Sequence, residues 1–416
     1  MSRPAIEKTG ALDLWSEGAA RPAGTLPERL LGPALALAIG AGLVAAARAV
    51  AQEPQGGTLA LSLVLGSLFG FVLQRSRFCF FCIWRDLIDR RDPRGALGVL
   101  AALAVGVAGY SAVFGAFLPD PSGVRLPPQA HIGPVGLLLV LAGLTFGAGM
   151  AISGSCISAH LYRLGEGSPT APFALVGTAA GFGLGFLAWN PLYLASISQA
   201  PVLWLPRTLG YAGALALGLA MLALLAWPLF RFLAAEPARA ASARPDPLRA
   251  VFVERWPAWI GGLAVGAIAT VAYFRIAPLG VTAEIGSRTR QGLAALDVLP
   301  ERLEGLDAFR GCATIIRDAV LTPNGLFIGG LVLAAFAAAL AAGQFKPAWP
   351  DPGQAVRGLV GGVLLGFGAM IGLGCSIGTF LSGIMAGAVS GWVFGAAMLA
   401  GVTATLLVGR RVGLLS

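Results

Sequence analysis

The chain has 416 residues, of which 56% are hydrophobic and only 12% are charged, and its formal net charge is +9. A soluble domain usually carries about 25% charged residues, so half of the charge expected on a water-exposed surface is missing. This composition excludes an ordinary soluble globular protein. Nucleic-acid binding is also disfavoured, because the arginines cluster in short stretches between apolar runs, as they do in membrane proteins.

Apolar runs of about 20 residues, the length of a helix that crosses a bilayer, recur along the chain. Residues 1–30 form a predicted polar N-terminal tail, since they contain no short apolar core followed by a cleavage site. The predicted spans are 31–50, 58–74, 95–118, 134–153, 171–188, 208–230, 257–275, 323–342, 357–374 and 388–408. The predicted fold is an all-α polytopic membrane protein in a lipid bilayer, with about nine or ten transmembrane helices.

The arginines predict the orientation of these spans. They are concentrated in the loop 75–94, in the linker 234–256 and at the C-terminus, which places these stretches and both termini in the cytoplasm. The Pro- and Arg-rich linker divides the chain into a first transmembrane half, 31–233, and a second half, 257–416. Counting crossings from a cytoplasmic N-terminus places the segment 276–322 on the external side of the membrane, although it carries five arginines. Part of this segment is predicted to dip into the membrane.

The two halves resemble each other. GAGMAISGSCISAHL (147–161) and GFGAMIGLGCSIGTF (366–380) both place a G-x-G motif ahead of a cysteine. Upstream, each half has an earlier cysteine followed by Arg-Asp, with Cys79 and Cys82 in the first half and Cys312 in the second. Five predicted crossings separate Cys156 from Cys375, so the motifs point in opposite directions. This indicates an inverted repeat with two-fold pseudo-symmetry, a common plan for transporters.

The segments SGSCIS (153–158) and GLGCSIG (372–378) are predicted to interrupt helices at their Gly and Ser residues. A short helix that restarts there offers free N–H groups and a positive dipole end, which attract anions. A thiol is a weak donor with a soft sulfur, and it suits a sulfur-bearing anion. The predicted substrate-binding residues are Cys79, Cys156 and Cys375. A second group comprises Cys312, Cys82, Ser155, Gly154, Gly374 and Ser376.

Simpler interpretations compete with this one. A cysteine in a membrane helix is usually a small apolar filler, and a Gly-rich helix is usually a packing surface. Cys156 and His160 could share a helix face as metal ligands, but no matching cluster accompanies them. Arg85 and Asp86 are predicted to form an ion pair at the membrane boundary. Cys79-Phe-Phe-Cys82 has the spacing of a redox dithiol, so a membrane thiol–disulfide oxidoreductase stays an alternative.

The motifs SRFCFFCIWRD, GAGMAISGSCISAHLYRLGEGS, LEGLDAFRGCATIIRD with LTPNGLF, and GFGAMIGLGCSIG together resemble the YeeE/YedE family of sulfur-compound transporters. The resemblance runs in order over about residues 58 to 408. It implies an hourglass-like helical protein with short re-entrant helices, which takes up thiosulfate across the bacterial inner membrane and is not an enzyme. It also implies that Cys79, Cys156 and Cys375 pass thiosulfate along by S–H hydrogen bonds.

The family's properties suggest further expectations. A small cytosolic TusA-like sulfur-transfer protein is an expected partner, no cofactor is expected, and some relatives are associated with selenium compounds instead of thiosulfate. Two positions depart from the family pattern. Ser155 stands where glycine is usual, and Cys82 adds a thiol to the first motif.

Overall fold

The computed structural model describes residues 26–54, 56–234, 246–306, 309, 319 and 321–414. Ten long helices dominate this part of the chain: α1 (Leu26–Ala51), α2 (Gly56–Ser76), α4 (Arg94–Phe117), α5 (Leu137–Ser153), α7 (Ala171–Leu187), α9 (Leu205–Ala234), α11 (Ala258–Arg275), α13 (Pro323–Ala341), α14 (Pro352–Ile371) and α16 (Val389–Arg411). The shorter elements are α3 (Phe80–Arg90), α6 (Ile157–Gly165), α8 (Trp189–Ala195), η2 (Ile197–Gln199), α10 (Pro247–Phe252), α12 (Ala283–Ala295), η4 (Ser376–Ser382) and α15 (Gly383–Met385).

The helices confirm the predicted polytopic membrane fold. Among the described residues, nine helices are long and apolar enough to cross a membrane, and α7 with α8, bent by 55°, would make a tenth span. Each of the ten predicted spans coincides with one long helix. The span predicted at 357–374 ends early, at Ile371, because the chain leaves the helical path at the following residues. The stretch 75–94, predicted as a loop, contains the helix α3.

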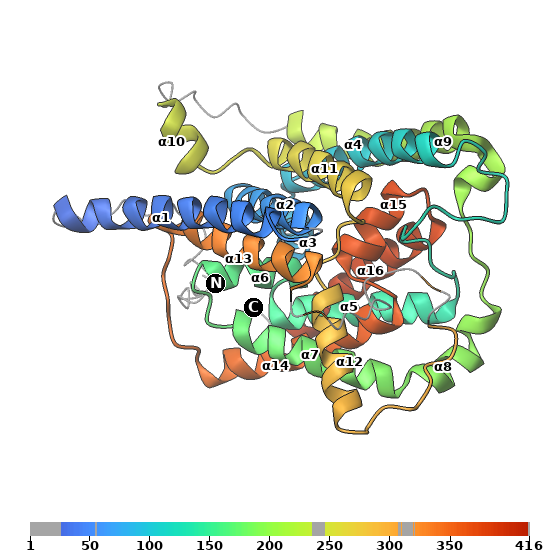
Figure 1. The fold of residues 1–416 in the computed structure, drawn as a ribbon. Coiled ribbons are helices and arrows are strands. Elements are labelled where there is room, and N and C mark those ends of the chain that lie inside the picture. The colour runs from blue at the N-terminus through green and yellow to red at the C-terminus, as the bar shows by residue number, and fades with distance from the viewer. Residues whose placement is uncertain are drawn as a thin grey trace, which may run out of the picture.

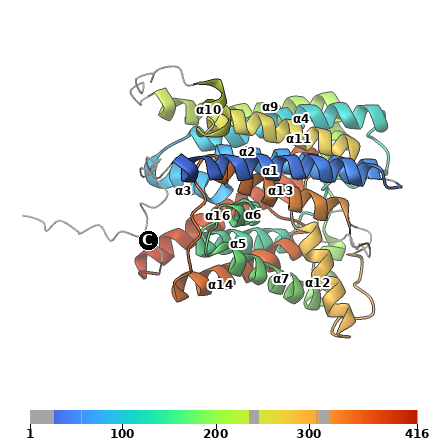
Figure 2. The ribbon, with the colours of Figure 1, turned by 60° about the vertical axis from the view of Figure 1, so that its left-hand side comes forward.

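The long helices pack in layers, with α4, α9 and α11 on one side of the molecule and α7 and α14 on the other (Figures 1 and 2). Helices α5 and α16 lie between them. The most extensive contacts join α7 to α14, α2 to α13, α5 to α16, α4 to α11 and α5 to α14, and each of these pairs brings the two halves of the chain together. The close approach depends on glycine: a Cβ on Gly366 of α14 would overlap the carbonyl oxygen of Thr178 on α7.

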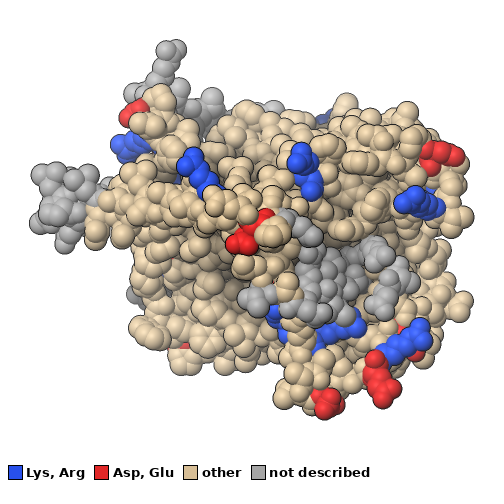
Figure 3. Space-filling model, viewed as in Figure 1, with Lys and Arg blue, Asp and Glu red and all other residues tan. Residues whose placement is uncertain are grey.

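The outer surface fits a lipid environment. Most of the face in Figure 3 carries no charged side chain, and large apolar residues point outward from several of the long helices. Examples are Leu37, with 76% of its surface exposed, Leu224 with 74% and Trp227 with 66%. Such exposure would be costly in water and is expected where lipid tails surround the protein.

Two connecting segments are folded against this bundle. The described end of the linker forms α10. The Arg75 side chain of α2 donates to the carbonyl oxygens of Phe252 and Val253, at the C-terminal end of α10. In the segment 276–322, Leu279 and Val281 are buried, and the Leu279 carbonyl accepts a hydrogen bond from the Ser382 hydroxyl (3.2 Å). Part of that segment therefore belongs to the interior, beside η4.

Candidate functional site

Each of the three leading cysteines is the last residue before the first turn of a short helix. Cys79 precedes α3, Cys156 precedes α6 and Cys375 precedes η4, and all three have extended backbone angles. The carbonyl oxygen of each accepts a hydrogen bond of 2.9–3.0 Å from the N–H four residues later. The first-turn N–H groups of α3, α6 and η4 are thus oriented toward the side on which each cysteine lies.

The two predicted helix interruptions are present. Helix α5 ends at Ser153, and Gly154 turns the chain with a φ of +77°, a left-handed conformation that glycine adopts without strain. In the second half α14 ends at Ile371, and the left-handed turn falls on Leu373, with a φ of +58°. Gly374 follows, where a Cβ would lie 2.6 Å from the Thr379 hydroxyl oxygen. Glycine is needed there because the chain folds back so closely on its next helix.

The first-half cysteines come together although 77 positions separate Cys79 from Cys156 in the sequence. The thiol of Cys79 lies next to those of Cys156 and Cys82. The Cys156 sulfur is 3.2 Å from the Ser158 hydroxyl oxygen. Cys79 and Cys156 are completely buried and Cys82 is half-buried, and all of them are free thiols. A short row of soft sulfur atoms therefore runs between the starts of α3 and α6.

Other polar groups surround this row. The Ser155 hydroxyl donates to the Gly154 carbonyl (2.7 Å) and accepts from the guanidinium of Arg163, on α6. His160 does not point toward a metal site: its Nε2 lies 3.1 Å from the hydroxyl of Ser153, at the end of α5. These hydrogen bonds connect the end of α5 to α6. The thiols are the most polarizable side chains at the break.

Cys375 precedes a separate short helix, η4, in which three of the seven residues, Ser376, Thr379 and Ser382, carry hydroxyls. In η4 the N–H of Phe380 bonds to the Cys375 carbonyl (3.4 Å), an i→i+5 bond of the π-helical type often found at functional sites. The fully buried Ser376 hydroxyl has no hydrogen-bond partner within the described part of the chain. The Phe380 ring packs against that of Phe80 on α3, with centroids 5.5 Å apart. Helix α3 thus contacts η4 through an aromatic pair.

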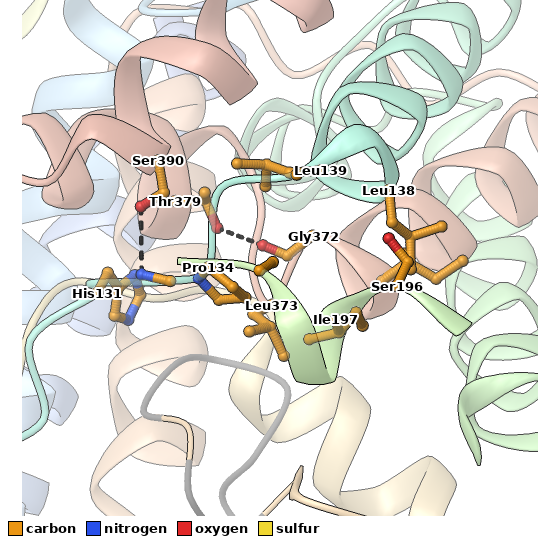
Figure 4. A pocket seen from close by; sticks show the side chains of 14 residues that line it. His131, Pro134, Leu138, Leu139, Ser196, Ile197, Gly372, Leu373, Thr379 and Ser390 are labelled. Carbon is orange, nitrogen blue, oxygen red and sulfur yellow. Dashed lines mark hydrogen bonds between the residues drawn. The ribbon is translucent and has the colours of Figure 1, made fainter. Parts of the chain in front are cut away.

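A small cavity of about 20 Å³, large enough for one water molecule, lies beside this second break (Figure 4). Gly372, Leu373 and Thr379 line it from the break, and His131 and Ser390 line it from the opposite side. The Ser390 hydroxyl accepts from the backbone N–H of Gly133 (3.2 Å), and the Thr379 hydroxyl donates to the Gly372 carbonyl (3.0 Å). The neighbourhood of Cys375 therefore combines apolar walls with a few fixed polar groups, the usual composition of a small-ligand site.

A sequence model of the family described as sulphur transport matches residues 75–404 of this chain. The chain belongs to this family. The thiosulfate transporter TsuA of Spirochaeta thermophila is 28% identical over 348 residues, which cover 80% of this chain and 93% of that protein. TsuA of Escherichia coli is 28% identical over 369 residues, covering 83% and 93%. A probable transporter, YedE of Escherichia coli, is 26% identical over 157 residues, covering 38% and 37%.

The resemblance to the YeeE/YedE family is thereby confirmed, and this sulphur-transport family member is a multi-pass membrane transporter and not an enzyme. Its candidate site residues divide into three groups. Cys79, Cys82 and Cys156 meet; Cys375, Gly374 and Ser376 form the second break; and Cys312 lies outside the described residues. Arg85 and Asp86 form the predicted ion pair, at 2.8 Å.

The sequence interpretation missed several polar residues of this transporter. A buried network lies at the end of α2, where Gln74 donates to the Glu166 carboxylate (3.0 Å) and to the Gln344 side chain (2.8 Å). Arg75 donates to both glutamines (2.6 and 3.1 Å). Arg163, His131 and Thr379 were missed as well. Only the unusual presence of charged residues in the apolar stretch HLYRLGEG could have drawn attention to Arg163 and Glu166.

Proposed function

We propose that this protein takes up thiosulfate, or a closely related sulfur oxyanion, across the bacterial inner membrane along a central pathway that Cys79, Cys156 and Cys375 line. One observation carries the proposal. All three cysteines are completely buried, and each stands at the start of a short helix next to an interruption of an apolar span. The names of the two TsuA relatives, which are thiosulfate transporters, support the choice of substrate.

The chemistry of these positions suits a divalent sulfur anion. Irregular backbone at membrane depth is tolerated where it is buried or lines a cavity, and transporters place such breaks at their binding sites. The helix N-terminus contributes N–H groups and partial positive charge, and the thiol contributes a weak donor and a polarizable surface. An anion held by weak donors can move on to the next site, whereas a full positive charge at every step would retain it.

The pattern of helix contacts supports a two-fold repeat, and the five predicted crossings between Cys156 and Cys375 make that repeat inverted. If α2, α4, α5, α6 and α7 correspond to α11, α13, α14, α15 and α16, the contacts occur in matched sets. The pair α2 and α13 corresponds to α11 and α4, the pair α5 and α16 to α14 and α7, and the pair α6 and α13 to α15 and α4. The α5–α14 pair then lies on the two-fold axis. An hourglass-like pathway with one break opening toward each face follows from this symmetry.

Uptake of an anion with two negative charges requires a driving force. A negative interior opposes its entry by about 2.3 kcal/mol per charge for each 100 mV. Rapid consumption inside the cell would supply that force, which is why a TusA-like sulfur-transfer protein is a plausible cytosolic partner. Selenium oxyanions are also small oxyanions, and they are the competing substrates that the uptake experiment must include.

The test is uptake of radiolabelled thiosulfate by cells that lack other thiosulfate importers, with sulfate and selenite as competitors. Removal of one hydrogen bond to a charged group costs about 1.5–3 kcal/mol. Cys156→Ala and Cys375→Ala should therefore each lower uptake by roughly ten- to a hundredfold at equal membrane expression.

The matched control is Thr178→Ala, which removes a buried hydroxyl on α7 that donates to the Ala174 carbonyl of its own helix. It should transport like the wild type. Near-wild-type rates in both cysteine variants would contradict the proposed pathway. Preferential competition by selenite would leave the pathway intact and reassign the substrate.

A further inference from the structure

We propose that Arg163 is a substrate-selectivity residue, which holds the oxygen end of the transported anion where the row of first-half thiols reaches the surface. Cys82 and Ser155 complete this site. The inference rests on the proposed transport of sulfur oxyanions and adds a cationic position to a pathway otherwise composed of weak donors.

The guanidinium of Arg163 connects the first turn of α3 to the residues that follow α5. Its Nη2 donates to the Cys82 sulfur (3.1 Å), on α3. Its Nη1 donates to the Gly154 carbonyl (3.3 Å) and to the Ser155 hydroxyl, both at the end of α5. Arg163 is seven residues beyond Cys156, which is about two helical turns, so both side chains leave the same face of α6. One cation is thus fixed between the two cysteine-bearing segments.

The contacts form a continuous row that ends on this cation. The row runs from the Cys156 thiol to that of Cys79, then to Cys82 and finally to the guanidinium. Burial decreases in the same order: Cys156 and Cys79 are completely buried, whereas Cys82 and Arg163 are half-buried. An anion that moved along this row of thiols would reach Arg163 next, and the arginine pattern predicts that this residue lies on the cytoplasmic side.

The contacts of Arg163 with Cys82, Gly154 and Ser155 can be exchanged for an anion. A thiol, a carbonyl and a hydroxyl are neutral acceptors, and hydrogen bonds between two charged partners are about twice as strong. The planar fork of arginine matches two oxygens of an oxyanion, whereas lysine offers only a point charge. Cys82 beside it provides a soft contact for the terminal sulfur. Together they would distinguish thiosulfate, which has a sulfur end and an oxygen end, from sulfate, which has only oxygens.

A purely structural role makes different predictions. If Arg163 only braces α3 against α5, its removal should lower thermal stability and the maximal uptake rate while leaving the half-saturation concentration unchanged. If it holds the anion, the half-saturation concentration should change most. Arg85 provides a matched control, because it is a half-buried arginine on α3 whose charge also lies near Cys82 but whose guanidinium hydrogen-bonds to Asp86 and, among the described residues, to no thiol.

The experiment measures the concentration dependence of thiosulfate uptake in Arg163→Gln, Arg163→Lys and Arg85→Gln, with sulfate as competitor. We expect Arg163→Gln to raise the half-saturation concentration at least tenfold. Arg163→Lys should raise it less and should make sulfate a better competitor, and Arg85→Gln should behave like the wild type. An unchanged half-saturation concentration in both Arg163 variants, or an equal rise in Arg85→Gln, would overturn the proposal.

A second measurement separates this inference from the proposed function. Purified wild-type protein is heated with thiosulfate, sulfate or selenite, and the ligand-induced rise in melting temperature is compared with that of Arg163→Lys, the variant that keeps the charge. If selenite alone stabilises the wild type, and does so less in the variant, the proposed substrate is wrong and the Arg163 site stands. If thiosulfate stabilises both proteins equally, the site is wrong and the substrate stands.

Discussion

The break at Cys156 and the break at Cys375 share one backbone plan but differ in their surroundings. In both, an apolar helix ends, a left-handed residue turns the chain, and a buried cysteine starts a short helix. The first break is polar and contains a cation, since Cys156 is linked through two further thiols to Arg163. The second break has hydroxyls but no charged residue between 371 and 383, and the Ser376 hydroxyl has no hydrogen-bond partner among the described residues. The comparison suggests that repeated motifs can bind the same anion with different strength.

The largest expected effect comes from disturbing the packing of α14, in the second half, against the end of α5 at the first break. A Cβ on Gly361 of α14 would lie 2.6 Å from the backbone nitrogen of Ser153 and 2.9 Å from the Gly149 carbonyl oxygen. Gly361→Ala should therefore destabilise the protein by about 1–3 kcal/mol and reduce uptake, because the end of α5 must move. Thermal melting in detergent measures this. Gly42→Ala is the control, since nothing lies within 4 Å of a Cβ there, and equal melting temperatures would contradict the close packing.

A smaller effect is expected from pH at the second break. Burial lowers the pKa of His131 from 6.5 to about 4, and a hydrogen bond to Gly378 offsets only part of this. The unfolded chain therefore binds a proton more readily, and stability falls as the pH decreases from 6.5 toward 4. Between pH 7.5 and pH 5 the loss should be about 2 kcal/mol. Melting curves of the wild type and His131→Gln test this, and an equally steep pH dependence in both would assign the loss to other groups.

The smallest expected effect distinguishes the two serines that adjoin the cysteines. Ser155→Ala removes an acceptor of Arg163 and should cost about 1 kcal/mol of stability. Ser376→Ala removes a buried hydroxyl without a partner among the described residues, so stability should stay equal or rise slightly. Thermal melting and thiosulfate uptake are measured together. If Ser376→Ala lowers stability as much as Ser155→Ala, the contrast between a hydroxyl bonded to a cation and a hydroxyl without a partner is wrong.

Much of the fold and of the candidate site could be predicted from the sequence, because local chemistry determines them. Apolar runs long enough to cross a bilayer predicted each long helix. Gly and Ser residues within such runs predicted the breaks at Gly154 and Gly374, since small flexible residues end a helix where no water can replace its hydrogen bonds. The position of the cysteine at the start of the next helix follows from the same local signal.

Only the tertiary structure decided which of these residues meet. Cys79 reaches Cys156, and Cys82 reaches Arg163, because α3 and α6 are brought together by long helices that pack across both halves. The same packing buried Leu279 beside η4, replaced the predicted loop by α3, and placed the Phe80 ring against that of Phe380. Contacts between residues this far apart in the chain depend on how all the helices fill space together, and no periodicity or motif within one segment encodes them.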